Sequence, residues 1–319
     1  MVSNLYLLGA GFTRSVFSNA PLNHEVLEAL ARENPHSWVH ELHRRYPGDD
    51  VELSLTRLDV DRASSGDSDL DELRSGLEGE LACFFRKFNA TRAHWDRVPW
   101  IRRLCDEVIQ NEDAVISLNY DCAIEGFLDL CGKWTPNGGY GANLYCPLGA
   151  GEYTPSSVTV LKVHGSANFV IAPSLDNPTA QFVGFEVNDR VFPISGLNRE
   201  YGVGLGRGRH YIIAPSYVKV PVVEIASLML EAVSAAQAAE RLVVVGCGLR
   251  PEDAFLRLVI TRFFQGRSRT SKRLVVLDPN ASSILGRISE FWGGLVEDQL
   301  SKIECGLEDA VDQLVEYLG

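Results

Sequence analysis

The sequence predicts a doubly wound α/β protein with a parallel sheet and a helical insertion between its first two strands. Three observations favour this class. Five short apolar runs, each bounded by polar residues or glycine, are typical of buried parallel strands. Amphipathic segments with helical spacing lie between most of these runs, as in a doubly wound sheet. The first two runs are about a hundred residues apart, which is too long for a single crossover connection.

The regular elements follow from these patterns in chain order. The five strands are expected at Leu5–Leu8, Ala114–Ser117, Val160–Val163, Leu242–Val245 and Leu274–Leu277, with a weaker sixth candidate at Lys302–Cys305. Outside the insertion, helices are expected at Glu25–Ala31, Cys122–Leu130, Pro221–Glu240, Glu252–Phe264, Ser282–Trp292 and Leu307–Leu318. A proline such as Pro221 suits the first turn of a helix because its missing N–H has no partner there.

Residues 35–110 are expected to form the helical insertion of a single domain that spans residues 1–319. Apolar residues from Leu70 to Phe88 recur at steps of three and four, which is one face of a helix. A second such face runs from Val98 to Val108. The segment Asp59–Asp69 is rich in Asp, Ser and Arg and is expected to be a surface loop. Residues 130–215 are rich in Gly, Pro, Asn and Tyr, so this region is expected to be partly irregular.

Composition and charge exclude several classes of protein. The chain of 319 residues has 42 acidic and 30 basic side chains and a net charge of −12, which argues against broad contact with a nucleic-acid backbone. No run of about 18 apolar residues predicts a membrane span, and the first residues lack the features of a signal peptide. None of the seven cysteines forms a Cys-x-x-Cys pair, so we expect no zinc site, no disulfide and a cytoplasmic location.

The first candidate motif follows the first strand, where two glycines stand directly before a helix. Glycines at such a turn let the backbone approach a pyrophosphate, and the helix N-terminus supplies N–H donors. The third glycine of the dehydrogenase fingerprint is replaced by Arg14, and no acidic residue ends a second strand roughly 20 positions later. A hydride-transfer enzyme is therefore disfavoured. The candidate binding residues of this motif are Gly9, Ala10, Gly11, Phe12, Thr13 and Arg14.

Polar residues follow the second and third strands. Asn119 and Asp121 stand at the carboxyl end of the second strand, where open α/β sheets bind their ligands. They could hold an amide and a ribose hydroxyl, or they could form an Asx turn that caps the next helix. His164 ends the third strand and is followed by glycine. A histidine at that edge can serve as a general base, although a structural histidine is the alternative.

Glycines and polar residues also follow the last two predicted strands. Gly246 and Gly248 come after the fourth strand and precede an acidic helix start. Asp278 and Asn280 come after the fifth strand, where they could meet a ribose. A helix cap is the alternative interpretation of both motifs.

Taken in order, these five motifs resemble the sirtuin-like superfamily. Gly-Ala-Gly, Asn-Tyr-Asp, His-Gly-Ser, Gly-Cys-Gly-Leu and Asp-Pro-Asn follow successive strands, and the ordered set is more specific than any member. The sequence is most similar to the bacterial branch that hydrolyses NAD in antiphage defence. The tract Ile212–Lys219 also resembles one that recurs in that branch. The resemblance spans most of the chain and implies a Rossmann-like fold.

The resemblance further implies a role for each motif. Gly9–Thr13 would hold the pyrophosphate of NAD, Asn119 would contact the nicotinamide ribose, and His164 would be the general base. The remaining implied contacts are Asp121 near the nicotinamide carboxamide, Gly246 and Gly248 along the phosphate and ribose path, and Asn280 at the adenine-side ribose.

The expected activity is that of an NAD glycohydrolase with NAD as substrate and no metal. It would release nicotinamide and ADP-ribose, or a cyclic ADP-ribose. Sirtuin deacylases carry a glutamine where this chain has Leu118, and they carry a four-cysteine zinc module that this chain lacks; both departures put deacylation in doubt. A deacylase, an ADP-ribosyltransferase and a non-catalytic NAD or ADP-ribose sensor remain alternatives. Because such an enzyme would deplete cellular NAD, we expect gating by homo-oligomerisation or by a co-encoded partner protein.

Overall fold

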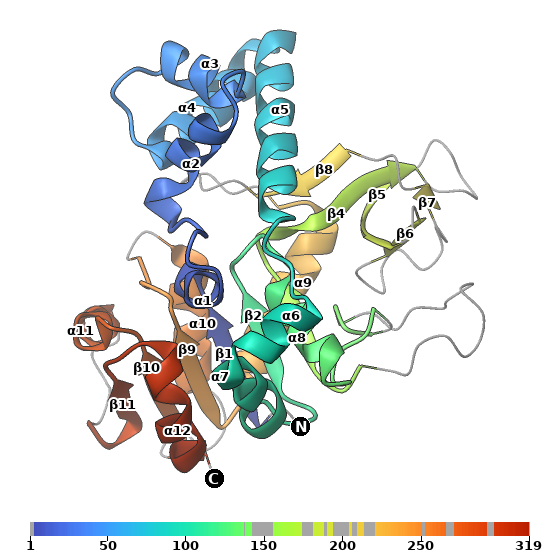
Figure 1. Cartoon of the computed structure of the whole chain (residues 1–319). Coiled ribbons are helices and arrows are strands. Elements are labelled where there is room, and N and C mark those ends of the chain that lie inside the picture. Colours follow the sequence, from blue (N-terminus) through green and yellow to red (C-terminus); the bar gives the residue numbers. More distant parts are fainter. Residues whose placement is uncertain are drawn as a thin grey trace.

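A six-stranded parallel sheet forms the centre of the fold (Figure 1). The computed structural model describes residues 3–136, 138–141, 156–173, 181–187, 190–193, 204–205, 209–213, 221–250, 253–265, 271–291 and 297–318. The strands of the sheet are β1 (Asn4–Leu8), β2 (Ala114–Ser117), β3 (Thr159–Lys162), β9 (Arg241–Val245), β10 (Arg273–Leu277) and β11 (Leu300–Ile303). The five confident strand predictions agree with these bounds to within one residue, and β11 begins two residues earlier than predicted.

The strand order confirms the predicted doubly wound, Rossmann-like class. The order across the sheet is β3-β2-β1-β9-β10-β11, and every pair is parallel. The order therefore reverses between β1 and β9. In this class, ligands bind in the crevice outside the carboxyl ends of the strands at that reversal point. The two central strands are buried along most of their length, which explains their nearly continuous apolar sequence.

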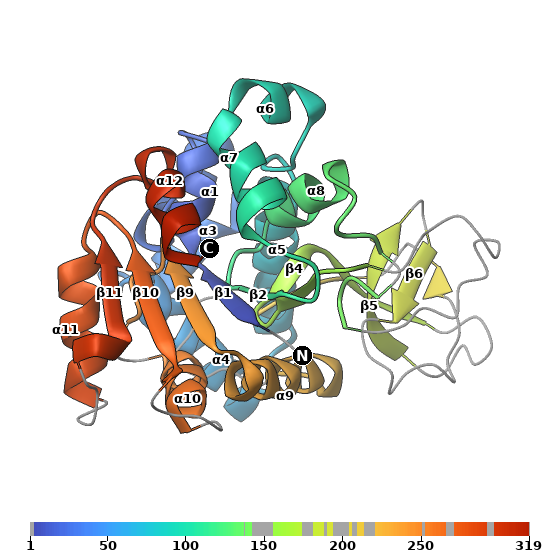
Figure 2. The ribbon, with the colours of Figure 1, turned by 90° about the horizontal axis from the view of Figure 1, so that it is seen from below.

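Helices cover both faces of the sheet (Figure 2). One face carries α1 (Ala10–Val16), α7 (Pro99–Arg103), the π-helical turn η2 (Leu104–Val108), α8 (Ala123–Leu130) and α12 (Leu307–Leu318). The other face carries α9 (Val223–Ala238) and α10 (Ala254–Gln265), and α11 (Ala281–Phe291) lies beside β11. Among the helices predicted outside the insertion, Leu307–Leu318 matches α12. The other five agree with the observed helix bounds to within two residues. In the described ranges, no helix is both long and apolar enough to cross a membrane.

Four helices stand apart from the sheet, beyond the carboxyl ends of its strands (Figure 1). They are α2 (Val26–Glu33), α3 (Trp38–Arg45), α4 (Val51–Ser65) and α5 (Ser68–Phe85), preceded by the short turn η1 (Asn23–Glu25). We call residues 26–85 the helical module. The remainder of the predicted insertion behaves differently, because α6 (Arg92–Arg97) contacts α7 and α8, while α7 and η2 pack against α12.

The predicted surface loop at Asp59–Asp69 is wrong, since α4 continues to Ser65 and only a short turn separates it from α5. The polar composition reflects one face of a helix. Asp59 forms an ion pair with Arg74 of α5 at 2.8 Å, and Asp61 accepts a hydrogen bond from Tyr46 at 2.8 Å. The turn itself is made by Gly66, which has a left-handed backbone with φ of +63°.

Sequence reasoning placed no strands between residues 165 and 212, whereas much of the described part of this range forms a second, antiparallel sheet. Its strands are β4 (Gly165–Pro173), β5 (Gln181–Val187), β6 (Arg190–Pro193), β7 (Gly204–Leu205) and β8 (Arg209–Ile212), in the order β7-β6-β5-β4-β8. The strands are short, and β4 carries a shift in register against β8, so the sequence shows no regular alternation. Residues 142–155 and 214–220 lie outside the described part of the chain.

Candidate functional site

A cavity of about 710 Å³ opens at the carboxyl ends of the parallel strands. This volume falls within the range of small-molecule sites. The residues that follow β1, β2, β3, β9 and β10 all contribute to its wall. The cavity thus lies at the reversal point of the sheet, where this fold class binds ligands. Of the sequence-predicted residues, those in the wall are Gly9, Ala10, Gly11, Thr13, Asn119, Asp121, His164, Gly246, Gly248, Asp278 and Asn280.

Two glycine-containing loops meet at the centre of this wall. The Gly11 N–H donates to the carbonyl of Gly246 at 2.9 Å, and the Gly9 N–H donates to the carbonyl of Val245 at 3.0 Å. A Cβ on Gly11 would lie 2.7 Å from Gly246 Cα, and one on Gly9 would lie 2.6 Å from Gly246 O. Gly246 itself has a φ of +55°. The absence of a Cβ at these glycines is therefore needed for the two loops to pack together. The N–H groups of Gly9 and Gly11 already donate hydrogen bonds to backbone carbonyls of the protein.

The loop after β9 also contains a strained residue. Leu249 is buried and has a φ of +42°, a region that a leucine rarely adopts. Such a conformation costs on the order of 1–3 kcal/mol and persists only where the surrounding structure enforces it. The strain lies in the wall of the cavity, as is common for functional loops.

Asn119 is held in a defined orientation by the first loop. Its side-chain amide donates to the carbonyl of Gly9 and to the hydroxyl of Thr13, both at 2.9 Å. The Thr13 hydroxyl in turn donates to Asp121 Oδ2 at 2.8 Å. Because both N–H groups of Asn119 are engaged, its Oδ1 is the atom that can meet a ligand hydroxyl. The amide therefore presents an acceptor to the cavity.

Asp121 supports this arrangement from behind. Its Oδ2 accepts from Thr13 and its Oδ1 accepts from the Ala123 N–H at 3.0 Å, so the side chain caps the start of α8 as the alternative interpretation proposed. Burial raises the pKa of the Asp121 carboxyl, and the nearby Lys162 ammonium opposes this rise. The contacts place the carboxylate oxygens on the protein and fit a supporting role better than direct contact with a carboxamide.

A buried ammonium group anchors the same loop. Lys162 is fully buried and lies 3.3 Å from Glu125 Oε1. Its Nζ also donates to the backbone carbonyl of Asp121. Burial raises the pKa of the Glu125 carboxyl, again opposed by Lys162. An ion pair this deep is costly to break, because the remaining charge would have no partner and no water.

His164 is the ionisable side chain contributed by the end of β3. It is largely buried, lines the cavity, and its Nε2 lies 3.9 Å from Oδ2 of Asp253. The backbone holds its position, since the Ile213 N–H donates to the carbonyl of His164 at 2.9 Å. Gly165 follows with a φ of +78°, and a Cβ there would lie 2.7 Å from the Tyr211 carbonyl. This explains the glycine after the histidine as a requirement of the turn into β4.

The far end of the cavity lies beside β10. Asp278 Oδ1 accepts from the Asn280 N–H at 2.8 Å, so this motif forms an Asx turn directly before α11. Arg287 of α11 lines the same region and donates to the carbonyl of Gly248. In contrast to the other glycines of the wall, a Cβ on Gly248 would meet only Arg287 Nη1, at 3.9 Å.

The helical module closes part of the cavity. Glu52 of α4 and Phe85 of α5 both line it. Glu52 forms an ion pair with Arg250, which follows β9. Sequence reasoning did not find these wall residues, because no local pattern shows which helix of an insertion returns to the sheet edge. The other lining residues that it left unassigned include Tyr120, Ile213, Met229, Cys247, Leu249, Asp253, Ser283 and Arg287.

Two predicted binding residues do not belong to the cavity wall. Phe12 is buried in the hydrophobic core, because it lies on the inner side of α1. Arg14 forms an ion pair with Glu25 and donates to the carbonyl of Ala20. It therefore fixes the chain that leads into the helical module. Neither side chain lines the cavity in this structure, and their predicted contacts with NAD stay predictions.

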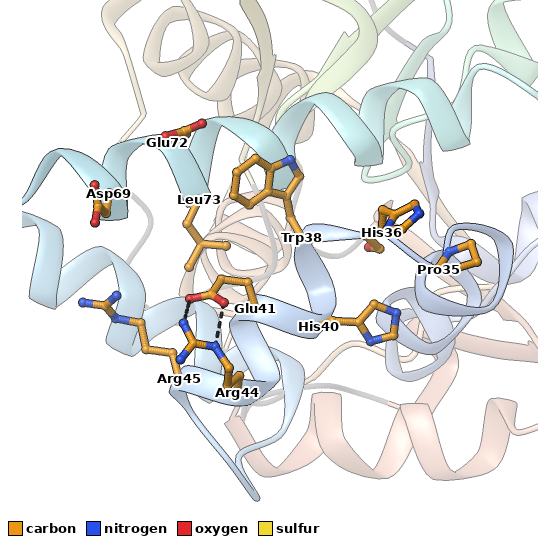
Figure 3. A pocket seen from close by; sticks show the side chains of 11 residues that line it. Pro35, His36, Trp38, His40, Glu41, Arg44, Arg45, Asp69, Glu72 and Leu73 are labelled. Carbon is orange, nitrogen blue, oxygen red and sulfur yellow. Dashed lines mark hydrogen bonds and ion pairs between the residues drawn. The ribbon is translucent and has the colours of Figure 1, made fainter.

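A second hollow of about 630 Å³ lies within the helical module, between α3 and α5 (Figure 3). Trp38 and Leu73 form its floor, and Arg44 is paired with Glu41 at its rim. It contains none of the predicted site residues and no buried ionisable side chain. The cavity at the sheet edge is therefore the candidate site.

Metal ligands are not gathered in the described part of the chain. No group of three or more His, Cys, Asp or Glu side chains there could hold a metal ion. Burial raises the pKa of the Cys122 and Cys247 thiols to about 12. Both therefore remain protonated near neutral pH and are poor nucleophiles. Cys146 lies outside the described residues.

Comparison with known proteins shows similarity at the level of solved structures. No protein-family profile and no curated protein sequence matches the chain. Similar solved structures include a Sir2 homologue in complex with NAD, with 14% identity and a TM-score of 0.41 over 99% of this chain and 88% of that chain. A mutant Sir2 homologue in complex with ADP-ribose has 14% identity and a TM-score of 0.44, with 99% and 91% coverage. Because identity and TM-score are both low, the function proposed below depends on this chain's own residues.

Proposed function

We propose that the chain is an NAD glycohydrolase, which cleaves the bond between nicotinamide and ribose. The observation that carries the proposal is the convergence of five strand ends on one cavity at the reversal point of the sheet. That cavity combines the hydrogen-bonded set of Asn119, Thr13 and Asp121 with His164 at the end of β3 and a glycine-lined wall. This combination suits a dinucleotide whose ribose is attacked by water.

The reaction requires little acid catalysis. The ribose C1′–nitrogen bond breaks, its electron pair stays on the nicotinamide nitrogen, and the pyridinium cation leaves as neutral nicotinamide. A water oxygen forms the new bond to C1′ and loses one proton. The products are nicotinamide, ADP-ribose and that proton, so charge and atoms balance. The protein must hold the ribose, direct the water and accept the proton.

The residues of the cavity can supply these three functions. Asn119 would accept a hydrogen bond from a ribose hydroxyl or from the attacking water through Oδ1, because its N–H groups are held by Gly9 and Thr13. His164 would accept the proton. The loops that contain Gly9–Gly11 and Gly246–Gly248 form the smooth wall along which the phosphates would lie. Attack by a base nitrogen of the substrate, in place of water, would form cyclic ADP-ribose.

Two alternatives share this site. A deacylase or an ADP-ribosyltransferase would use the same ribose cleavage but direct a second substrate to C1′, and a sensor would bind NAD without cleaving it. A peptide groove formed by residues 130–215 would favour a deacylase or transferase, and the described part of that region contributes His164 and Ile213 to the cavity wall. The chemistry at Asn119 and His164 favours turnover over sensing, because a binding module has no need of a proton acceptor.

The products separate these possibilities. The pure chain is incubated with NAD, and nicotinamide, ADP-ribose and cyclic ADP-ribose are quantified by chromatography, with and without an acetyl-lysine peptide. Hydrolysis predicts equal amounts of nicotinamide and ADP-ribose species, with no dependence on the peptide. Nicotinamide release that requires the peptide would identify a deacylase. Saturable NAD binding without any nicotinamide release would identify a sensor.

We further propose that the enzyme is a gated, NAD-depleting effector of bacterial antiphage defence. The proposal is supported by the order of the motifs along the sequence and by the consequence of the chemistry, since unregulated NAD hydrolysis would arrest the cell that makes it. Gating would act through assembly of identical chains or through a co-encoded partner protein. The helical module is a suitable element for this, because Glu52 and Phe85 connect it directly to the cavity.

A further inference from the structure

A carboxylate faces the histidine of the candidate site from a different element. His164 follows β3, whereas Asp253 directly precedes α10. Their Nε2 and Oδ2 atoms are 3.9 Å apart, and their side chains are 11% and 14% exposed. This distance exceeds that of a hydrogen bond but lies within the range at which opposite charges in a poorly hydrated site interact strongly. Both side chains line the same cavity.

Asp253 is held in place independently of the histidine. Its Oδ1 accepts a hydrogen bond from the Leu256 N–H at 3.2 Å, so the side chain caps the N-terminus of α10. The cap leaves the other carboxylate oxygen, Oδ2, on the side of His164. A negative charge is also favoured at the start of a helix. The carboxylate is thus positioned by α10 independently of the histidine.

Several charged side chains near this pair contact other residues. Arg250 is the cation closest to Asp253 in sequence, and it is engaged by Glu52 of α4. Lys162 is engaged by Glu125, and Asp121 by Thr13. Among the described residues, the other ionisable side chains that line the cavity are His24, Glu52, Tyr120, Asp121, Cys247, Arg250, Asp278 and Arg287.

We propose that Asp253 is a positioning residue that serves as the counter-ion of His164 during proton transfer. This inference rests on the hydrolysis proposed above. When His164 takes the proton of the attacking water it becomes an imidazolium, and the Asp253 carboxylate stabilises that cation until the proton passes to solvent. In this step the O–H bond of the water breaks, an N–H bond forms on His164, and the water oxygen bonds to C1′. The carboxylate does not take up the proton, because its role is to balance the charge.

The protonation of His164 can be measured without turnover. His164 is titrated by NMR in uniformly 15N-labelled protein, and its ring signals are assigned by their loss in His164→Asn. In Asp253→Asn, which keeps a good helix cap but loses the charge, the titration midpoint should fall by about one pH unit. Asp253→Ser, a second capping residue, should give the same shift. Asp67→Asn removes a charged cap from α5, outside the cavity, and should leave the midpoint unchanged.

The same variants are then compared by the pH dependence of the rate of nicotinamide release. Because His164 must be neutral to accept a proton, the acid limb of kcat/KM should move to lower pH in Asp253→Asn by the same amount as the midpoint. An unchanged NMR midpoint in both Asp253 variants would overturn the counter-ion assignment, even if NAD is hydrolysed. A shifted midpoint in a protein that releases no nicotinamide would instead support the ion pair and contradict the proposed hydrolysis.

Discussion

Replacing Gly11 with alanine should separate the two loops at the centre of the site. The added methyl carbon would lie 2.7 Å from Gly246 Cα and 2.9 Å from Gly246 O, whereas carbon atoms normally approach to about 3.5–4.0 Å. The loops must therefore move apart by about 1 Å. Overpacking of this kind costs about 2 kcal/mol, and weakening of the hydrogen bond from the Gly11 N–H to Gly246 adds about 1 kcal/mol. Alanine regains about 1 kcal/mol in helix propensity within α1.

The expected net loss in the free energy of unfolding is therefore about 2 kcal/mol, measured by urea denaturation at constant m-value. Gly248→Ala is the matched control, since its methyl group would meet only Arg287 Nη1 at 3.9 Å. It should change stability by less than about 0.5 kcal/mol. Gly246→Ala should be the worst of the three, because it combines a 2.5 Å contact to Phe12 N with a φ of +55°. Equal denaturation midpoints for Gly11→Ala and the wild-type chain would refute this reasoning.

Three further expectations concern the buried ion pair, metal content and gating. Lys162→Met should lower the free energy of unfolding by about 3 kcal/mol, because Glu125 loses its buried cation; a loss below about 1 kcal/mol in urea denaturation would contradict the ion pair. Elemental analysis of the purified chain should find no stoichiometric zinc, and one zinc per chain would show that the metal-free prediction is wrong. Specific NAD hydrolysis should rise with protein concentration or on addition of a co-encoded partner, and full activity of a dilute monomer would exclude gating by assembly.

Most of the parallel sheet could be predicted from the sequence because five of its strands are buried along most of their length and are therefore apolar runs. In β11 only Ile303 is buried, and it is the weakest of the predicted strands. The antiparallel sheet could not be predicted, since strands such as β6 and β7 have four and two residues and carry little periodic signal. The segment Asp59–Asp69 shows a different limit. Its charges suggest a loop, yet Asp59 is satisfied by Arg74 on another helix, and only the tertiary structure supplies that partner.

The candidate site also contains residues that the sequence predicts and residues that it does not. Residues that directly follow strands, such as Asn119 and His164, could be predicted because topology brings all strand ends to one edge. Glu52 reaches that edge from α4 of the helical module, and no local sequence pattern predicts this contact. At Phe12 a loop motif suggested a ligand contact, but helical geometry turns this side chain into the core.

The most direct test of the account is nicotinamide release from NAD by the purified chain and by three variants. His164→Ala should reduce the rate by about 10²–10⁴-fold through loss of the proton acceptor, and Asn119→Ala should reduce it by about 10²-fold through misplacement of the ribose or the water. His40→Ala, in the exposed hollow of the helical module, should hydrolyse NAD at the wild-type rate. Circular dichroism and thermal melting confirm that each variant is folded. Hydrolysis by His164→Ala at the wild-type rate would contradict the assignment of the active site.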